Sequence, residues 1–373
     1  MTLGVYEELG VIPIVNAAGT VTRYGGSLMD HDVIDVMREA SQQFCLLDEL
    51  QERAGIRIAE MLDVEAAYVT SSAACGLVLT AAACMAGSDP ERISQLPDAS
   101  GLKDEIIIQE AHRMPYDQSI RLSGAKLIQV GEGKAGPEQE MKSAINAQTA
   151  AVFYLANKMD DSSAVSFEDT IKIAHEALVP VIVDAASEAP PISTLSRFTR
   201  AGADLVIFSG GKSIRGPQST GLVVGRTDLI AAIAANGVPF ATIGRPMKVS
   251  REEIIAFIKA LDLFLHRDHD ADLNVWDNQL KHIETALAST EGVSLRRFTK
   301  GETYHVPLLA LEFAEGTSAS IEEIHDALLA GAPRIAVATH LVPGSLVVNP
   351  HSLQPGQERI VAERLKAVIE AIN

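Results

Sequence analysis

One lysine stands in a glycine-rich turn directly after a strongly apolar segment. The stretch reads Asp204-Leu-Val-Ile-Phe-Ser-Gly-Gly-Lys212-Ser-Ile-Arg-Gly-Pro-Gln-Ser. Glycines let the backbone approach a ligand closely, and a lysine at the end of a buried strand loses hydration and therefore basicity. An amine with a lowered pKa is what Schiff-base chemistry requires. Lys212 is therefore our candidate for a lysine that forms a Schiff base.

Two other interpretations of Lys212 need comparison with this one. A phosphate-binding P-loop requires a glycine where the chain has Val206, and Pro217 interrupts the helix that should follow. A surface lysine in an ordinary glycine turn stays open on this segment alone. Other segments must decide between a surface lysine and a reactive one.

An acid closes a second apolar segment, Val179-Pro-Val-Ile-Val-Asp184. Neighbouring parallel strands present their carboxyl ends at one edge of a sheet, where α/β proteins bind ligands. An aspartate at this edge can pair with a protonated pyridine nitrogen, as in the binding of pyridoxal phosphate (PLP). The alternative is an acid that caps a helix or forms a turn.

Small and hydroxylated residues follow a third strand-like segment, in Ala67-Tyr-Val-Thr-Ser71-Ser-Ala73-Ala-Cys-Gly. We call Ser71, Ser72 and Ala73 the serine turn. A helix that starts there presents unpaired N–H groups and a positive dipole end to an anion, and small side chains leave the site open. The alternative is an ordinary serine N-cap, but all three segments are expected at one sheet edge.

Three further groups are weaker candidates. His112 follows the strand expected over 105–109 and could stack on a flat ring, although a surface histidine is the simpler interpretation. Asn157 ends the strand expected over 150–156 and could hydrogen-bond a ring substituent or simply form a turn. The segment His266–Asp270 offers metal-ligand residue types but is more typical of the solvated end of a long helix, so no metal site is predicted.

Apolar, β-branched segments alternate with amphipathic helical ones, which predicts an α/β fold with crossover helices. Continuous apolar segments are typical of strands buried on both faces of a mainly parallel sheet. A helix is expected over 47–61 with Asp48 and Gln51 at its start, and a small-residue helix over 73–86. The seven expected strands are 66–70, 105–109, 125–130, 150–156, 179–184, 204–208 and 221–225.

The pattern changes after Ser250, which forms a capping box with Glu253 at the start of a long helix. Beyond it we expect a second helix, two strands over 294–298 and 307–313, and two more helices, which together form a smaller α+β unit. The predicted organisation is an N-terminal segment 1–40, a large ligand-binding domain 41–248 and a small C-terminal domain 249–373. Residues 1–40 could pack with either domain.

Composition limits the classes of function. The chain has 373 residues, with 31 Lys and Arg against 49 Asp and Glu, for a net charge of −18. Such acidity disfavours a nucleic-acid partner. The three cysteines form no Cys-x-x-Cys pair, no signal peptide is recognised and the apolar stretch 73–87 is too short for a spanning helix. We therefore expect a cytoplasmic protein with no membrane partner.

Taken together, these segments resemble fold-type I PLP enzymes, and within them the branch related to bacterial selenocysteine synthase, which includes the D-glucosaminate and D-glucosaminate-6-phosphate ammonia-lyases. The two most specific matches are Ser209-Gly-Gly-Lys-Ser-Ile-Arg-Gly-Pro-Gln218 and Ile243-Gly-Arg-Pro-Met-Lys-Val249. The others are Val15-Asn-Ala-Ala-Gly-Thr20, Thr70-Ser-Ser-Ala-Ala74 and Val183-Asp-Ala185.

The resemblance implies a role for each matching position. Lys212 holds PLP as a Schiff base and moves the substrate α-proton, and Asp184 keeps the ring nitrogen protonated. His112 stacks on the ring and is a second candidate for proton transfer. The residues implied to bind the cofactor phosphate are Ser71, Ser72, Ala73 and Ser209, with Gln218 reaching it from a neighbouring subunit. The candidates for binding the substrate are Arg23, Arg245 and Lys248.

The expected reaction is α,β-elimination from a 2-amino-3-hydroxy acid, such as the sugar-derived D-glucosaminate, to a 2-oxo-3-deoxy acid and ammonia. The expected assembly is a homodimer or a larger homo-oligomer. Racemase, aldolase or selenium-transferase-like β-replacement chemistry on the same cofactor is the first alternative, and a non-catalytic PLP- or metabolite-binding protein is the second. In the phosphorylated-sugar lyases we expect an arginine late in the chain, but the comparable stretch here reads Ile335-Ala-Val-Ala-Thr-His340-Leu, which disfavours a phosphorylated substrate.

Overall fold

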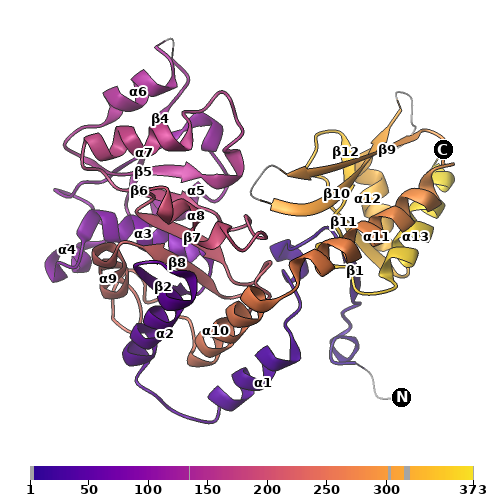
Figure 1. Ribbon diagram of the computed structural model, residues 1–373, viewed down its shortest axis with the longest axis horizontal. Coiled ribbons are helices and arrows are strands. Elements are labelled where there is room, and N and C mark those ends of the chain that lie inside the picture. The colour runs from indigo at the N-terminus through magenta and orange to yellow at the C-terminus, as the bar shows by residue number, and fades with distance from the viewer. Residues whose placement is uncertain (1–3, 134, 301–303, 315–319, 373) are drawn as a thin grey trace. The chain divides into compact units, whose positions relative to one another are not determined.

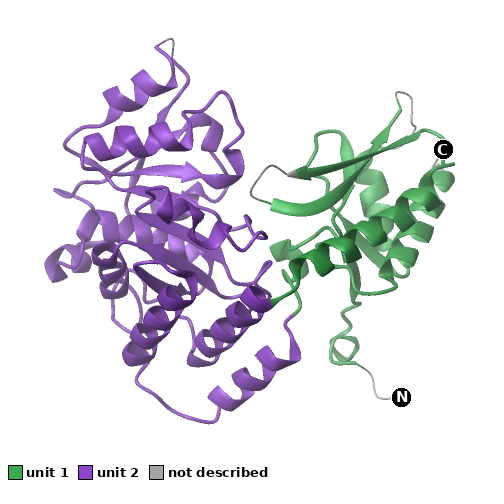
Figure 2. Ribbon diagram, in the orientation of Figure 1, with its two compact units in different colours: residues 1–28, 267–373 green, residues 29–266 purple. Residues whose placement is uncertain are grey.

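The computed structural model describes residues 4–133, 135–300, 304–314 and 320–372. Its contacts divide the chain into two compact units, a large unit of residues 29–266 and a small unit of residues 1–28 and 267–373 (Figure 2). The sequence predicted boundaries at 40/41 and 248/249 instead. The difference arises because helix α10 (Arg251–His266) buries Ile254, Phe257 and Phe264 in the core of the large unit.

The large unit contains one seven-stranded sheet in the order β2-β8-β7-β6-β5-β3-β4 (Figure 1). Only β8 pairs antiparallel with its neighbours, so the prediction of a mainly parallel seven-stranded sheet is confirmed. Three strands have the bounds predicted from the sequence, and the others differ by one or two residues. The strands are β2 (Ala66–Thr70), β3 (Glu105–Gln109), β4 (Lys126–Val130), β5 (Thr149–Leu155), β6 (Val181–Asp184), β7 (Leu205–Ser209) and β8 (Gly221–Gly225).

Helices follow most of these strands, and their ends are set by local signals. The Ser72 hydroxyl caps α3, and Ser250 and Glu253 form the predicted capping box before α10. Helix α2 departs from the prediction, because its N-cap is Leu46 and it has no side-chain cap. Besides α10, the α-helices of this unit are α1 (His31–Ala40), α2 (Leu47–Leu62), α3 (Ala73–Ala86), α4 (Pro90–Gln95), α5 (Asp117–Leu122), α6 (Pro137–Ala144), α7 (Phe167–Glu176), α8 (Thr194–Arg200) and α9 (Thr227–Asn236).

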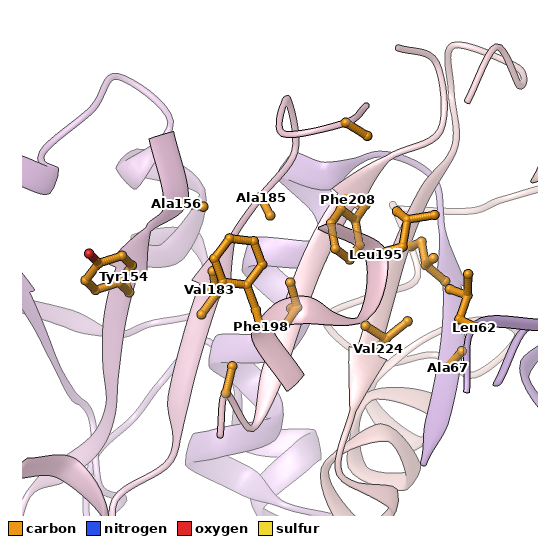
Figure 3. Close-up of a cluster of buried hydrophobic side chains, with 14 of the residues drawn as sticks. Leu62, Ala67, Tyr154, Ala156, Val183, Ala185, Leu195, Phe198, Phe208 and Val224 are labelled. Atoms are coloured by element: carbon orange, nitrogen blue, oxygen red, sulfur yellow. The ribbon is translucent and has the colours of Figure 1, made fainter. Parts of the chain in front are cut away.

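Both faces of the sheet are buried, which explains its continuous apolar strands. One face packs against α2, α7, α8 and α10 in a cluster that includes Val183, Phe198 and Phe208 (Figure 3). The other face packs against α3 and α9 through residues such as Ile207 and Val223. Because successive strand residues point to opposite faces, Ile207 and Phe208 belong to different clusters. A sheet fixed on both faces provides a rigid edge for a site.

The small unit has two sheets. Strands β1 (Ile14–Ala17) and β11 (Arg334–Val337) pair in parallel, and a three-stranded sheet has the order β12-β10-β9. The sequence predicted only two of these five strands, and the three that it missed have four residues each. The remaining elements are β9 (Val293–Lys300), β10 (Tyr304–Phe313), β12 (Ser345–Val348), α11 (His269–Leu287), α12 (Ile321–Ala330) and α13 (Gln357–Ile372).

Candidate active site

The predicted meeting of the serine turn and the lysine segment at one sheet edge follows from strand register. Gly221, the first residue of β8, pairs with Thr70 at the end of β2 and with Ser209 at the end of β7. The segments after Thr70 and Ser209 therefore flank the same glycine. Asp184, the last residue of β6, pairs with Ile207 two residues before the end of β7. The structure thus brings these three predicted segments together at the carboxyl edge of the parallel strands.

The serine turn presents backbone N–H groups at the N-terminus of α3, an arrangement that suits an anion. The Ser72 side chain accepts a hydrogen bond of 3.0 Å from the Cys75 N–H, and helix geometry leaves the N–H groups of Ala73 and Ala74 without intrahelical acceptors. All these residues are partly exposed. A Cβ at Gly221 would lie 2.5 Å from the Ser72 carbonyl carbon, so a glycine is required where β8 passes the turn.

Glycines also shape the segment that carries Lys212, which we call the lysine turn (Gly210–Gln218). The Gly216 N–H donates to the Gly210 carbonyl at 2.9 Å and closes the turn. A Cβ at Gly210 would lie 2.1 Å from the Thr220 hydroxyl oxygen, and one at Gly211 would lie 2.5 Å from the Gln218 Cα. The turn is therefore tight, and it holds Lys212 half-buried at the end of a central strand.

Asp184 is buried, with 7% of its surface exposed, and its Oδ1 accepts a hydrogen bond of 2.9 Å from the Ala186 N–H. Burial raises the pKa of this carboxyl, whereas the Ala186 N–H and the positive charge of Lys212 act in the opposite direction. A cation placed beside Asp184 therefore stabilises its charged form. Lys212 is close enough to contribute to this electrostatic effect, as expected for residues of one site.

His112 is fully buried in the 3-10 helix Glu110–His112 after β3. Its Nδ1 lies 3.5 Å from the Leu155 amide nitrogen, and its ring packs edge-on against Tyr154 with centroids 4.4 Å apart. Burial lowers the pKa of His112 to about 4, so the imidazole is neutral at neutral pH. A neutral ring suits a packing role, and it lacks the acidic proton of an imidazolium.

Two buried polar atoms near this edge have no hydrogen-bond partner within the described residues. They are Nε2 of His112 and Oδ1 of Asn157, which lies in the 3-10 helix Ala156–Lys158 after β5. A buried polar atom without a partner can be satisfied by an ordered water or by a ligand, and these two lie at the edge that carries the other candidate residues. An anion-binding helix N-terminus, a lysine, a buried acid and these two orphans form the donor and acceptor set that a pyridine ring with a phosphate group requires. The residues present therefore fit PLP.

The sequence missed two residues of this site. Ser213 is buried, and its hydroxyl donates to the Ala189 carbonyl, which connects the lysine turn to the segment after Asp184. Glu188 is only 2% exposed, and its negative charge raises the pKa of Asp184. Its position four residues after Asp184 was the available signal. A cavity of about 10 Å³ separates the two segments, lined in part by Ala186, Ser209 and Lys212.

The predicted substrate-binding residues lie on exposed segments. Arg245 and Lys248 are exposed on the loop before α10, and Gln218 is exposed at the end of the lysine turn. Arg23 is exposed in the 3-10 helix Thr22–Tyr24 and belongs to the small unit. His266 uses its Nδ1 to contact the Asp262 carbonyl of its own helix at 2.8 Å.

Neither a metal nor a membrane is indicated by the described residues. No group of three or more His, Cys, Asp or Glu side chains is placed to hold a metal ion in that part of the chain. Over the same residues, no helix has the length and apolar character needed to cross a bilayer.

Comparisons with known proteins match this architecture along the whole chain. A family model described as SelA, L-seryl-tRNA selenium transferase, matches residues 14–284. A 5'-C-glycyluridine monooxygenase-decarboxylase from a Streptomyces species is 32% identical over 377 residues, covering 98% of this chain and 92% of that protein. A D-glucosaminate-6-phosphate ammonia lyase from Salmonella typhimurium is 27% identical over 378 residues, covering 99% of each.

Solved structures agree with these relatives. A D-glucosaminate-6-phosphate ammonia-lyase matches with a TM-score of 0.82 and 25% identity, and both chains are covered in full. A serine palmitoyltransferase structure with PLP matches with a TM-score of 0.61 and 15% identity, over 96% of this chain and 88% of that one. The second likeness shows the fold alone, and that fold is the predicted fold-type I architecture.

Proposed function

The chain belongs to the L-seryl-tRNA selenium transferase family and is a PLP-dependent lyase of fold type I, and from this premise we propose that it catalyses α,β-elimination from a 2-amino-3-hydroxy acid. The proposed substrate is a sugar-derived amino acid of the D-glucosaminate class, and the products are ammonia and a 2-oxo-3-deoxy acid. The observation that carries the proposal is the electrostatic coupling of Lys212 and Asp184 at a sheet edge beside the α3 N-terminus.

We propose that the residues of this edge divide the cofactor between them. Ser71, Ser72, Ala73 and Ser209 hold the phosphate, supported by the open N-terminus of α3. Asp184 accepts the ring N–H, and His112 and Asn157 contact the ring through their unpartnered atoms. When bound, PLP supplies an electron sink that stabilises the negative charge formed when the substrate loses its α-proton.

Lys212 is the residue that moves the proton. Its Nζ takes the proton from the substrate Cα and returns it to the β-oxygen as the Cβ–O bond breaks, so the hydroxyl leaves as water. The released enamine tautomerises and is hydrolysed to ammonia and the 2-oxo acid. The sequence also named His112 as a proton donor, but with a pKa of about 4 its ring is not an imidazolium at neutral pH. We therefore assign His112 to holding the ring alone.

The substrate carboxylate needs a cationic partner, and Arg23, Arg245 and Lys248 are the candidates. All three side chains are exposed, so water and a ligand can reach them. The stretch that ends in the exposed His340 lacks the late arginine that the resemblance led us to expect, and for this reason the unphosphorylated sugar acid is the substrate we test first.

We propose a homodimer or a larger homo-oligomer, with Gln218 reaching the cofactor phosphate of a neighbouring subunit. The exposure of Gln218 supports this role. The assembly is also supported by two large apolar side chains that lie on the surface, Phe44 with 96% and Leu46 with 69% of its surface accessible.

We also propose a cytoplasmic location, which the three free cysteines support. The proposed partners are small molecules and not nucleic acids, because the net charge is −18.

The experiment is to incubate the PLP-loaded protein with D-glucosaminate, D-glucosaminate-6-phosphate and a panel of 3-hydroxy amino acids. We expect equal amounts of 2-oxo acid and ammonia from at least one sugar acid. Racemisation, or retro-aldol cleavage without ammonia, would refute the elimination and leave the role of the cofactor intact. Replacement of the β-hydroxyl by an added thiol or selenide would point to transferase chemistry instead.

A second candidate reaction uses the same cofactor and breaks the bond to the carboxylate. It is favoured by the 32% identity with the Streptomyces monooxygenase-decarboxylase, the higher of the two identities reported above. Oxygen uptake and release of CO2 with a glycyl nucleoside substrate would support it. An oxygen electrode separates the two candidates, because elimination consumes no O2.

A further inference from the structure

The small unit contains a closed ring of three hydrogen-bonded residues that the proposed reaction does not use. Asn349 Nδ2 donates to the Tyr304 hydroxyl at 3.3 Å, and that hydroxyl lies 2.9 Å from Nδ1 of His351. The His351 N–H donates to Asn349 Oδ1 at 3.0 Å. None of the three residues is more than 8% exposed. The ring therefore fixes which way the Asn349 amide points.

Asn349 also faces the loop after β1. Its N–H donates to the Ala17 carbonyl at 2.8 Å, and a Cβ at Gly19 would lie 2.3 Å from its Nδ2. Gly19 has a φ of +83°, a conformation that favours glycine. Only a residue without a side chain fits against the Asn349 amide at this point, so the two positions constrain each other.

The loop beyond Gly19 is closed by its own hydrogen bonds. Asn16 Nδ2 donates to the Gly19 carbonyl at 2.9 Å, and the Ala18 N–H donates to Asn16 Oδ1 at 3.0 Å. The Val21 N–H donates to the same Gly19 carbonyl at 2.9 Å. Asn16, Ala18 and Gly19 belong to the segment Val15–Thr20, one of the matched motifs to which the proposed function gives no role. These bonds make the segment a firm support for the short helix at Thr22–Tyr24.

Arg23 is the middle residue of that 3-10 helix. Its neighbours Val21 and Tyr24 pack on the small-unit core around Ala18, Leu308 and Val347. The Arg23 side chain is exposed and makes no ion pair with a carboxylate of the described residues. Among the described residues, Arg23 is therefore an unpaired cation on a loop whose backbone is held by the packing of the residues before and after it.

We propose that Asn349 is a positioning residue, which acts through Gly19 to hold the backbone of the loop that presents the Arg23 guanidinium to a carboxylate ligand. The inference rests on the role given to Arg23 in the proposed function. A guanidinium presented on a pre-organised loop loses less entropy when it binds an anion than one on a mobile loop. Asn349 itself touches neither the substrate nor the cofactor in this proposal.

The test compares the Asn349→Ala holoenzyme with the wild type. We expect the KM for D-glucosaminate to rise about tenfold, while kcat stays within about twofold of the wild type. A misplacement of about 1 Å can cost ~100-fold, so a tenfold change corresponds to a smaller shift of Arg23. We expect faster hydrogen exchange over residues 18–26. The affinity for D-gluconate, a carboxylate with no amine to react, falls by a similar factor in Asn349→Ala and in Arg23→Ala, measured by calorimetry.

Matched variants separate positioning from general loss of stability. Leu365→Ala removes a fully buried side chain of α13 in the same unit and should lower Tm while leaving KM and the exchange of residues 18–26 near wild type. Tyr304→Phe keeps the aromatic side chain and removes the hydroxyl that orients the Asn349 amide. It should therefore raise the KM and speed the exchange of residues 18–26 by less than Asn349→Ala does. If Asn349 acts through Gly19, the Gly19→Ala/Asn349→Ala double variant is no worse than Gly19→Ala alone.

Each outcome decides the proposal. Unchanged gluconate affinity in Asn349→Ala, no gluconate binding by the wild type, or an equal KM change in Leu365→Ala overturns it. If no lyase activity is found but gluconate affinity and loop exchange change together, the positioning role holds and the proposed reaction is wrong. If kcat falls with an unchanged KM, Asn349 acts on the chemistry by another route and the proposal fails.

Discussion

The Ser213 hydroxyl donates a hydrogen bond to the carbonyl of Ala189. This bond joins the lysine turn to the segment after β6, and both residues are buried. Lys212 precedes Ser213 directly, and Asp184 begins the segment that contains Ala189. The Ser213–Ala189 hydrogen bond therefore helps to set the position of Lys212 relative to Asp184, and it involves neither of these two side chains. Lys212 or Asp184 can be replaced without removing that hydrogen bond.

The first prediction concerns Lys212. Lys212→Ala should abolish the Schiff-base absorbance of the PLP-loaded protein and reduce turnover by ~10²–10⁴-fold, the usual contribution of a positioned acid or base. Borohydride reduction of the wild type followed by peptide mapping should locate the cofactor on Lys212. A modified lysine elsewhere, or full activity of the variant, contradicts the assignment.

The second prediction concerns Asp184. Asp184→Asn keeps the size of the side chain and removes the charge that pairs with the ring nitrogen. We expect kcat to fall about 10–100-fold, which corresponds to the loss of one charge-assisted hydrogen bond of about 1.5–3 kcal/mol. Stopped-flow spectra and steady-state kinetics measure it. The matched control Glu188→Gln changes a neighbouring buried carboxyl and should lower kcat less than Asp184→Asn does. A larger loss of kcat in Glu188→Gln would show that the roles of the two acids are misassigned.

The third prediction concerns Gly221. Gly221→Ala places a Cβ 2.5 Å from the Ser72 carbonyl carbon and 2.7 Å from the Ala73 nitrogen, so the serine turn must move. We expect PLP to dissociate more readily, measured by equilibrium dialysis. Gly55→Ala is the control, since its Cβ would lie 2.3 Å from the Ala67 carbonyl oxygen at the other end of β2. It should lower stability without a specific loss of PLP affinity.

The fourth prediction concerns pH. The pKa of His112 is lowered to about 4 in the folded protein from an ordinary value of 6.5, so between these two pH values the unfolded chain binds more protons than the folded one. The free energy of unfolding is therefore unaffected by the titration of His112 above pH 6.5. It decreases as the pH falls from 6.5 toward 4, by up to about 3 kcal/mol.

Urea unfolding of the PLP-free protein at several pH values measures this loss. His112→Asn should flatten the decline between pH 6.5 and 4, whatever its effect on stability at pH 7. His282→Asn, at an exposed histidine of α11, should keep the wild-type slope. An unchanged slope in His112→Asn would show that the imidazole is not buried in solution.

The fifth prediction concerns assembly. Phe44 is 96% exposed, and it packs only loosely beneath the Arg251 guanidinium, whose carbon lies 5.3 Å from the ring centroid. Phe44→Glu should weaken self-association by about 30-fold or more, the effect of losing an interface hot spot. Sedimentation velocity over a concentration series measures it. Leu178→Glu changes a leucine that is 92% exposed elsewhere in the large unit and should leave assembly unchanged. A monomeric wild type that retains full activity would contradict the proposed oligomer.

Local pattern predicted the strands of the large unit and the sheet edge at which the candidate residues meet. Strands β2, β3 and β8 have their predicted bounds because each apolar segment ends at a residue that stops it, and the predicted sheet edge follows because parallel strands place their carboxyl ends together. Lys212 and Asp184 could therefore be brought together from the sequence alone. The Ser250 capping box was also predictable, because its two residues are three positions apart.

Only the tertiary structure decided the features that depend on distant residues. Strands β1, β11 and β12 were not predicted, and each pairs with a strand that is distant in the sequence. The pKa of His112 depends on burial against β5, which no neighbouring residue indicates. Gly19 and Asn349 lie near opposite ends of the chain, and their contact arises when β12 brings Asn349 beside β1. The spacing of residues in the sequence predicts interactions between near neighbours, such as helix caps and strand ends. Which distant side chains are buried together is determined only by tertiary packing.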